Sequence, residues 1–254
     1  MSIAGWEVTR RRTVTLFHQL NGRYHGPALW IYMIIIVAHW LEHVLQIYQI
    51  YALGWLPAQA GGLLGVIFPK LVESEVLHFV YDFIQWAGIV VLRPGFMRHA
   101  RALAYWTAAM VVQTWHFFEH ILLISQYVSG RFLFGAARQI SIGQLWFPRA
   151  ELHFFYNLFV FVPMVIAVHY YLKPKLALIE TSNTTSSNPK QDHELNIKTM
   201  QRTEQLAEDN NDDEREDVPF GADGVQFLRN LLQFGVFLGI WMLLLIVVRW
   251  FNAQ

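Results

Sequence analysis

Five apolar runs constrain the fold of this chain more than any other feature of its sequence. They lie at about residues 28–52, 76–92, 102–128, 152–172 and 225–250. Most of them reach the roughly 20 residues that an α-helix needs to cross the hydrocarbon core of a bilayer. Since 54% of the residues are hydrophobic and 15% are aromatic, an ordinary soluble domain is excluded. The sequence predicts an all-α integral membrane protein with a lipid bilayer as its main environment.

The order of apolar and polar segments predicts five regions. These are a cytoplasmic N-terminal segment (1–27), a first two-span repeat (28–95), a second two-span repeat (96–175), an acidic disordered linker (176–223) and a C-terminal transmembrane helix (224–254). The linker is polar and has almost no large apolar side chains, so it cannot bury enough surface to fold by itself. The last span contains neither an acid nor a histidine, which is typical of a plain membrane anchor.

The basic residues near the span ends are distributed unequally between the two sides of the membrane. One side would hold Arg10, Arg11, Arg12, Arg23, Arg93, Arg98, Arg101, Lys173 and Lys175, and the other Lys70, Arg131, Arg138 and Arg149. Short loops rich in Lys and Arg stay in the cytoplasm. The N-terminus is therefore predicted to be cytoplasmic and the C-terminus to lie outside.

The chain contains no cysteine. This excludes disulfides, thiolate metal sites, iron–sulfur clusters and c-type haem attachment within this chain. The formal net charge of +0 and the apolar composition predict no nucleic-acid partner. The oligomeric state is left open by the sequence.

An internal duplication organises the first four spans. His39, Glu42 and His43 recur 77 residues later as His116, Glu119 and His120, and the string LHFVYD at 77–82 recurs 75 residues later as LHFFYN at 152–157. Because each unit contains two spans, both units have the same orientation in the membrane, as in parallel-repeat membrane proteins. The sequence therefore predicts a four-helix transmembrane bundle built from a duplicated two-span hairpin, plus the fifth helix.

Each of these four spans carries one polar stripe on an otherwise apolar cylinder. At 100° per residue, His39, Glu42 and His43 fall on one helical face, and the equivalent residues of the third span do the same. An ionisable group that faces lipid costs at least about 2.5–3.5 kcal/mol. The four stripes are therefore expected to point into the bundle and to cluster there, and the sequence leaves open whether they form one shared site or two.

The residue types on these stripes indicate a metal centre. Imidazole and carboxylate groups bind iron, copper, zinc and manganese when thiolate is absent, and two histidines four residues apart on a helix can bind the same ion. The candidate ligands are His39, Glu42, His43, His78, His116, Glu119, His120 and His153. Glu42 and Glu119 are also the candidate catalytic groups, as bridging ligands or proton acceptors. Four further residues, Asp82, Asn157, Tyr81 and Tyr156, are expected to hold the ligands in place by hydrogen bonds.

Three classes of function are compatible with this pattern. The first is a membrane metalloprotein with one or two metal ions, such as an oxidoreductase that acts on a lipid-soluble substrate and exchanges electrons with a membrane redox partner. The second is a b-type haem protein, since the duplication supplies one histidine per facing helix. The absence of a second histidine layer about four turns away speaks against it. The third is a proton or metal-ion transport or relay protein.

Overall fold

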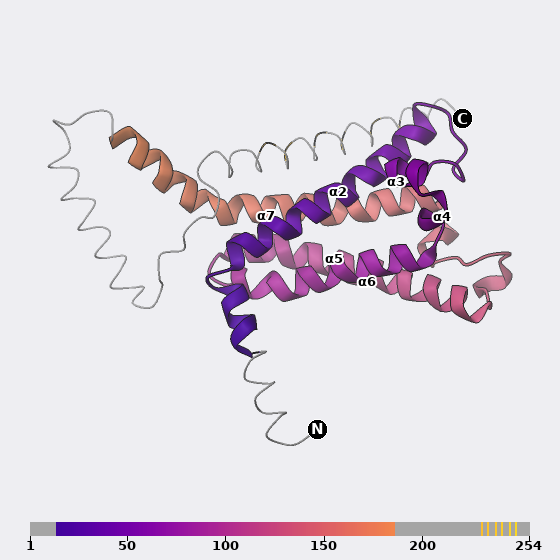
Figure 1. The fold of residues 1–254 in the computed structure, drawn as a ribbon, viewed down its shortest axis with the longest axis horizontal. Helices are drawn as coiled ribbons and strands as arrows, with labels where there is room; N and C mark the ends of the chain where they lie inside the picture. The colour runs from indigo at the N-terminus through magenta and orange to yellow at the C-terminus, as the bar shows by residue number, and fades with distance from the viewer. Residues whose placement is uncertain are drawn as a thin grey trace, which may run out of the picture.

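The computed structural model describes residues 14–185 and six further positions between 230 and 247 (Figure 1). These six positions are helical and exposed. Residues 186–223 of the predicted acidic linker, most of the predicted fifth span and the first 13 residues lie outside the described residues. Residues 176–185, which were predicted to belong to the disordered linker, instead continue helix α7. Throughout the described part the regular elements are helices, which confirms the predicted all-α class.

Six α-helices and three short 3₁₀ helices follow a helical segment at residues 14–21. They are α2 (His25–Tyr51), α3 (Gly62–Ile67), α4 (Pro69–Val72), α5 (Glu75–Leu92), η1 (Arg93–Phe96), α6 (Ala100–Ser129), η2 (Leu133–Gly135), η3 (Gly143–Leu145) and α7 (Arg149–Thr185). The ends of the long helices have recognisable stop and start signals. The side chain of Ser74 accepts a hydrogen bond from the backbone N–H of Val76 and caps α5, and Gly130 ends α6 in the left-handed conformation at φ 64°.

Three helices are long and apolar enough to cross a membrane: His25–Tyr51, Glu75–Phe96 and Arg149–Lys173. They correspond to the first, second and fourth predicted spans. The third predicted span forms α6, whose 30 residues extend over about 45 Å, but α6 is not among the three. Its buried face carries Gln113, His116 and Glu119, and these polar groups lower its mean hydropathy.

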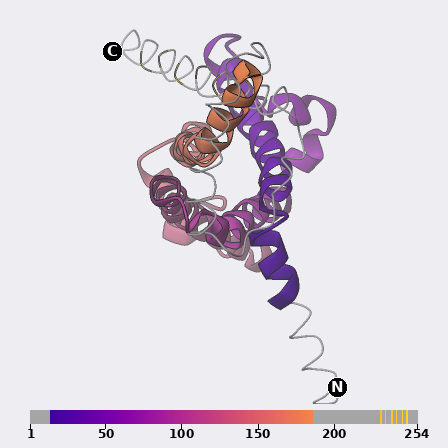
Figure 2. The same cartoon turned by 90° about the vertical axis from the view of Figure 1, so that its left-hand side faces the viewer.

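The four long helices lie side by side around a common axis (Figures 1 and 2). α6 packs against both α5 and α7, while α2 packs mainly against α7 and over a shorter stretch against α5. The polar stripes of all four helices therefore meet inside the bundle. The end where α3, α4 and the segment between α6 and α7 lie is called the loop end below.

The other end of the bundle, where η1 joins α5 to α6, is filled by aromatic rings. Phe96 and Trp106 are fully buried and their rings stack with centroids 4.5 Å apart. The Trp106 indole donates a hydrogen bond of 2.8 Å to the Ile89 carbonyl. Near the middle, Trp40 stacks on Phe154 at 5.2 Å. His25 packs among these rings, 4.9 Å from Phe96 between centroids, whereas the six candidate ligand histidines lie farther toward the loop end.

The outer surfaces of the long helices are apolar. Ile31 is 64% exposed, Val111 is 63% exposed and Phe159 is 58% exposed. Monomeric soluble proteins rarely expose contiguous apolar surface on this scale. Together with the three candidate spans, these surfaces indicate a lipid bilayer environment.

An ion pair joins α5 to α7 at the loop end. The Arg149 guanidinium binds both carboxylate oxygens of Glu75, with Nη2 2.7 Å from Oε2. The Gln139 side chain adds a hydrogen bond of 3.0 Å to the same carboxylate. Glu75 is only 2% exposed, so this carboxylate depends on its partners for compensation of its charge.

We expect the Arg149→Met variant to be less stable by about 2–3 kcal/mol in free energy of unfolding. Breaking a fully buried pair costs roughly 3–5 kcal/mol, and the loss is smaller here because the Arg149 side chain is 32% exposed. Denaturant unfolding in detergent micelles measures the change. The matched control is Arg138→Met, at an exposed position. Equal stability of the two variants would contradict the assignment.

Candidate metal centre

The six histidines predicted as ligands come together from four different helices. They are His39 and His43 on α2, His78 on α5, His116 and His120 on α6, and His153 on α7. Their rings form a continuous series, with centroids 4.5 Å apart for His39 and His43, 6.0 Å for His43 and His153, 4.9 Å for His153 and His120 and 6.2 Å for His120 and His78. The structure therefore supports one shared cluster of histidines.

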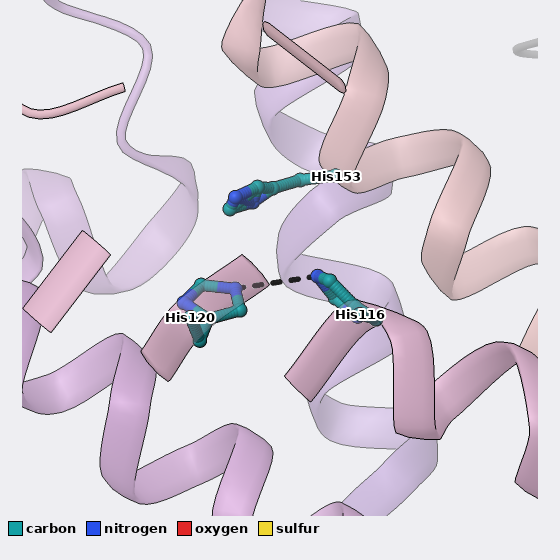
Figure 3. A group of neighbouring side chains, drawn as sticks. All are labelled: His116, His120 and His153. Atoms are coloured by element: carbon teal, nitrogen blue, oxygen red, sulfur yellow. Dashed lines mark hydrogen bonds between the residues drawn. The ribbon is translucent and has the colours of Figure 1, made fainter. Parts of the chain in front are cut away.

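His116, His120 and His153 form the tightest group in this cluster (Figure 3). One nitrogen from each ring lies within 4.8 Å of the other two, and the three side chains are buried. The Nε2 atoms of His116 and His120 are 3.3 Å apart. Two nitrogens bound to one tetrahedral ion at 2.0–2.1 Å are also about 3.3 Å apart. The pair on α6 therefore already has the separation that a shared metal ion requires.

The pair on α2 has nearly the same geometry. The Nε2 atoms of His39 and His43 are 3.1 Å apart. On the far side of the ring, His43 Nδ1 lies 3.1 Å from the side-chain oxygen of Gln46, which can accept its proton. In that tautomer the Nε2 lone pair of His43 faces His39 and is free to bind a cation.

A hydrogen bond of Nδ1 fixes the tautomer of His78 in the same way. Its Nδ1 lies 3.1 Å from the backbone carbonyl of Ser74, one helical turn earlier. A carbonyl only accepts hydrogen bonds, so Nδ1 carries the proton and Nε2 carries the lone pair. Metal-binding histidines are commonly oriented by a hydrogen bond of this kind.

Asp82 contacts the histidine pair of α6 directly. Its Oδ2 is 2.6 Å from His120 Nε2 and its Oδ1 is 3.4 Å from His116 Nδ1. The Gln113 side chain donates a hydrogen bond of 2.8 Å to Oδ1. Asp82 is 3% exposed, so its negative charge requires a positive partner. A metal ion bound by the two histidines would supply that charge.

A second sign of a cation site is an unsatisfied nitrogen. Within residues 14–185, Nδ1 of His120 has no hydrogen-bond partner although it is buried. Gln113 Oε1 is also buried without a partner. Buried polar atoms are normally paired. A group bound beside Asp82 could supply the partners that these two atoms lack.

The two predicted tyrosines pack on histidine rings. Tyr81 stacks on His39 with centroids 4.0 Å apart, and Tyr156 stacks on His116 at 4.7 Å. The Tyr156 hydroxyl accepts a hydrogen bond of 2.8 Å from the Trp115 indole. These tyrosines therefore orient two of the rings by stacking, whereas the sequence suggested hydrogen bonds.

Asn157 differs from Asp82, the residue that it matches in the sequence repeat. Its side chain donates to the backbone carbonyl of His153 at 2.9 Å, one turn earlier on the same helix. The carboxylate of Asp82 instead lies on the rings of α6. The two halves of the cluster are therefore not chemically equivalent.

The two glutamates of the repeated motif point toward the loop end. Glu42 Oε2 accepts backbone hydrogen bonds from Leu63 at 2.7 Å and Leu64 at 3.2 Å, at the start of α3. The backbone can approach this carboxylate so closely because Gly62, at φ +69°, has no side chain. A Cβ there would lie 2.2 Å from Glu42 Oε2.

Glu119 makes the corresponding contacts after α6. Its Oε1 accepts a hydrogen bond of 2.7 Å from the backbone N–H of Gly143, and its Oε2 accepts one of 3.0 Å from the Ser141 hydroxyl. Both glutamates thus hold the segment that follows their own helix over the histidine cluster. Their predicted roles as metal ligands and catalytic groups remain predictions.

Two glutamines strengthen the same connections, and sequence reasoning did not assign them to this role. The Gln49 side chain bonds both the N–H and the carbonyl of Gly62, at 2.9 and 3.1 Å. The Gln126 side chain accepts hydrogen bonds from the backbone of Leu133 and Ile140. The available signal was their recurrence at equivalent positions of the duplicated motif.

No family model, no curated protein and no solved structure matches this chain. The function is therefore inferred from the geometry of the site itself.

We expect the Glu119→Ala variant to increase hydrogen–deuterium exchange at residues 141–145 by about tenfold or more, because hydrogen bonds to a charged group contribute about 1.5–3 kcal/mol. Bound metal should be retained. Glu73→Ala, at an exposed position, is the matched control. Loss of metal with unchanged exchange would show instead that Glu119 is a ligand.

Proposed function

We propose that this chain is a polytopic membrane metalloprotein that binds one or two divalent transition-metal ions within its helical bundle. The observation that carries this proposal is the pairing of histidines four residues apart on α2 and on α6, with facing nitrogens 3.1 and 3.3 Å apart. A third imidazole, that of His153, has a nitrogen within 4.8 Å of the pair on α6. Iron, copper, zinc and manganese all accept such nitrogen and oxygen ligands.

The first ion would be bound by His116, His120 and His153, with Asp82 as the oxygen ligand. Three histidines and one carboxylate fill a tetrahedral sphere, or leave open positions in a larger one. Gln113 would hold the carboxylate in place through its hydrogen bond to Oδ1.

The second ion would be bound by the pair on α2, with His78 as the third imidazole. Gln46 and the Ser74 carbonyl support the required tautomers of His43 and His78. In the repeat Asn157 stands where Asp82 stands in the other unit, so this half of the cluster lacks an equivalent of the Asp82 carboxylate. Its net charge is less negative, so it should bind a divalent cation more weakly than the half that contains Asp82.

The proposed topology is a duplicated two-span hairpin with a cytoplasmic N-terminus and an additional C-terminal span. Parallel contacts support the duplication. Glu42 and Glu119 each bond the segment after their own helix, and Tyr81 and Tyr156 each stack on the first histidine of a motif. α6 would then be a span whose polar face is turned inward, and the loop end would lie outside.

The proposed activity is redox chemistry on a lipid-soluble substrate, with a membrane redox partner. Imidazole and carboxylate ligands suit iron and copper as well as zinc, and the bilayer surroundings favour an apolar reactant. Glu119 would serve as a proton acceptor beside the centre. The position of the cluster within apolar helices is the support for this activity.

Two other functions are less well supported. A b-type haem needs a flat slot between two facing histidines. The His78 and His120 rings are parallel, but His153 packs edge to face against both His120 and His116. A proton relay is favoured by the continuous series of rings from His39 to His78. A relay requires only single histidines in series, whereas α2 and α6 each carry a pair of facing nitrogens.

Metal content tests the proposal directly. We expect the purified full chain to contain about one or two equivalents of transition metal by elemental analysis and to show no Soret band. His120→Ala should lose most of the metal at the first position, because three ligands rarely hold an ion as well as four. His169→Ala, at an exposed position of α7, should retain it. Equal metal content in the two variants would refute the assignment.

The difference between the two halves gives a separate expectation. Asp82→Asn should weaken the tighter metal-binding step by at least about 10–100-fold, because it removes a charged ligand and a change to a group that only supports the ligands already costs that much. Asn157→Asp should leave that step unchanged and strengthen the weaker one. Competition titration with a chromophoric chelator measures both steps. A weaker effect of Asp82→Asn than of Asn157→Asp on the tighter step would contradict the proposed ligand set.

A further inference from the structure

A cavity of about 490 Å³ opens between α6, α7 and η3. This volume falls in the range of pockets that bind small organic molecules, about 300–1,000 Å³. Its walls are mostly aromatic and comprise Trp115, Trp146, Phe147, Phe155, Tyr156 and Phe159. Flat rings of this kind bind another flat ring by offset stacking and edge-to-face contacts.

Polar atoms are confined to one part of the cavity wall. Glu119 and Tyr156 both line it, and the Trp115 indole donates to the Tyr156 hydroxyl at 2.8 Å. The Tyr156 hydroxyl also hydrogen-bonds to the Glu119 side chain, so these groups form one polar patch on the wall. A bound molecule with an oxygen on its ring could add a hydrogen bond to this polar patch, whereas a plain acyl chain offers it no polar atom.

The cavity lies next to the proposed metal centre. Tyr156 lines the cavity and also stacks on His116 with centroids 4.7 Å apart. A molecule in contact with the Tyr156 ring would thus be separated from a candidate metal ligand by one aromatic ring. Glu119 also borders the cavity and lies one turn from His116 on α6, so a proton acceptor is close as well.

The depth of the cavity suits a molecule that arrives from the bilayer. Glu119 and Phe159 are each ten residues from the loop end of their helices, which corresponds to about 15 Å. The cavity therefore lies within one half of a hydrocarbon core that is about 30 Å thick. Phe159 and Trp146 are 58% and 71% exposed, so its rim is apolar where it would face lipid.

We propose that this cavity binds the head group of a lipid-soluble quinone or quinol. The inference rests on the proposed function, because it names the substrate class of that metal centre. A quinone ring combines the three properties that the cavity matches: a flat aromatic face, a ring oxygen that hydrogen-bonds to Tyr156, and an apolar tail that remains in the lipid.

Site-resolved photolabelling of the full chain in lipid nanodiscs tests this binding. The probe is an azido-benzoquinone with a ten-carbon tail, and the competitor is the same quinone without the azide. We expect the label on residues 142–159, and we expect excess competitor to abolish it. Mapping by mass spectrometry separates bound probe from probe dissolved in the lipid.

Two substitutions at η3 provide the matched comparison. Ile142→Trp places a large ring at a residue that lines the cavity and should lower the saturable label about fivefold or more, since an overfilled cavity cannot accept the probe. Leu145→Trp lies three residues later, in η3, but is not among the lining residues, and Leu145 is 45% exposed. This variant should label like the wild type.

A second pair of variants covers the case in which Ile142→Trp prevents folding. Phe155→Ala removes part of the cavity wall, and Phe83→Ala on α5 is its control. The proposal is supported if the saturable labelling decreases in Ile142→Trp and Phe155→Ala and not in their controls. Non-saturable label spread over the lipid-facing helices, or equal label in Ile142→Trp and Leu145→Trp, overturns it. Elemental analysis of the same samples keeps the two claims separate: label without metal refutes the metal centre, and metal without label refutes only quinone binding.

Discussion

The cost of placing ionisable side chains in a bilayer governs this structure. Isolated histidines and carboxylates on lipid-facing surfaces would each be strongly unfavourable, and the four long helices turn these groups toward one another. The resulting cluster extends from His39 to His78 through rings on all four helices. A cation provides the most direct compensation for the buried carboxylate of Asp82. The bundle and the proposed metal centre therefore depend on each other.

The two ends of the bundle have different tasks. The end near η1 is closed by packed aromatic rings such as Phe96 and Trp106, which exclude water and set the spacing of the helices. At the loop end, the segments after α2 and α6 are bonded to Glu42 and Glu119. These connections cover the histidines from the side that water would reach. The arrangement leaves the aromatic cavity beside α6 and α7 as an approach from the lipid.

Much of this organisation could be predicted from the sequence because helical periodicity places residues on faces. The inward direction of His116 and the convergence of six histidines followed from the repeated motif and the cost of burial. Average hydropathy was less informative for α6, since averaging does not distinguish an inward polar face from polar residues spread around a helix. The contacts of Glu42, Glu119 and Asp82 could not be predicted, because they depend on how the segments after the helices fold back and on which neighbouring helix each side chain meets.

X-ray absorption spectroscopy at the edge of the metal that copurifies with the full chain tests directly whether the histidine cluster binds that metal. We expect the spectrum to show nitrogen and oxygen ligands at about 2.0–2.2 Å from the metal, with the multiple-scattering pattern of at least three imidazoles. Replacement of His153 by alanine should remove one imidazole from that pattern. A spectrum that shows oxygen ligands alone, or a purified chain without metal, would contradict the proposed histidine metal centre.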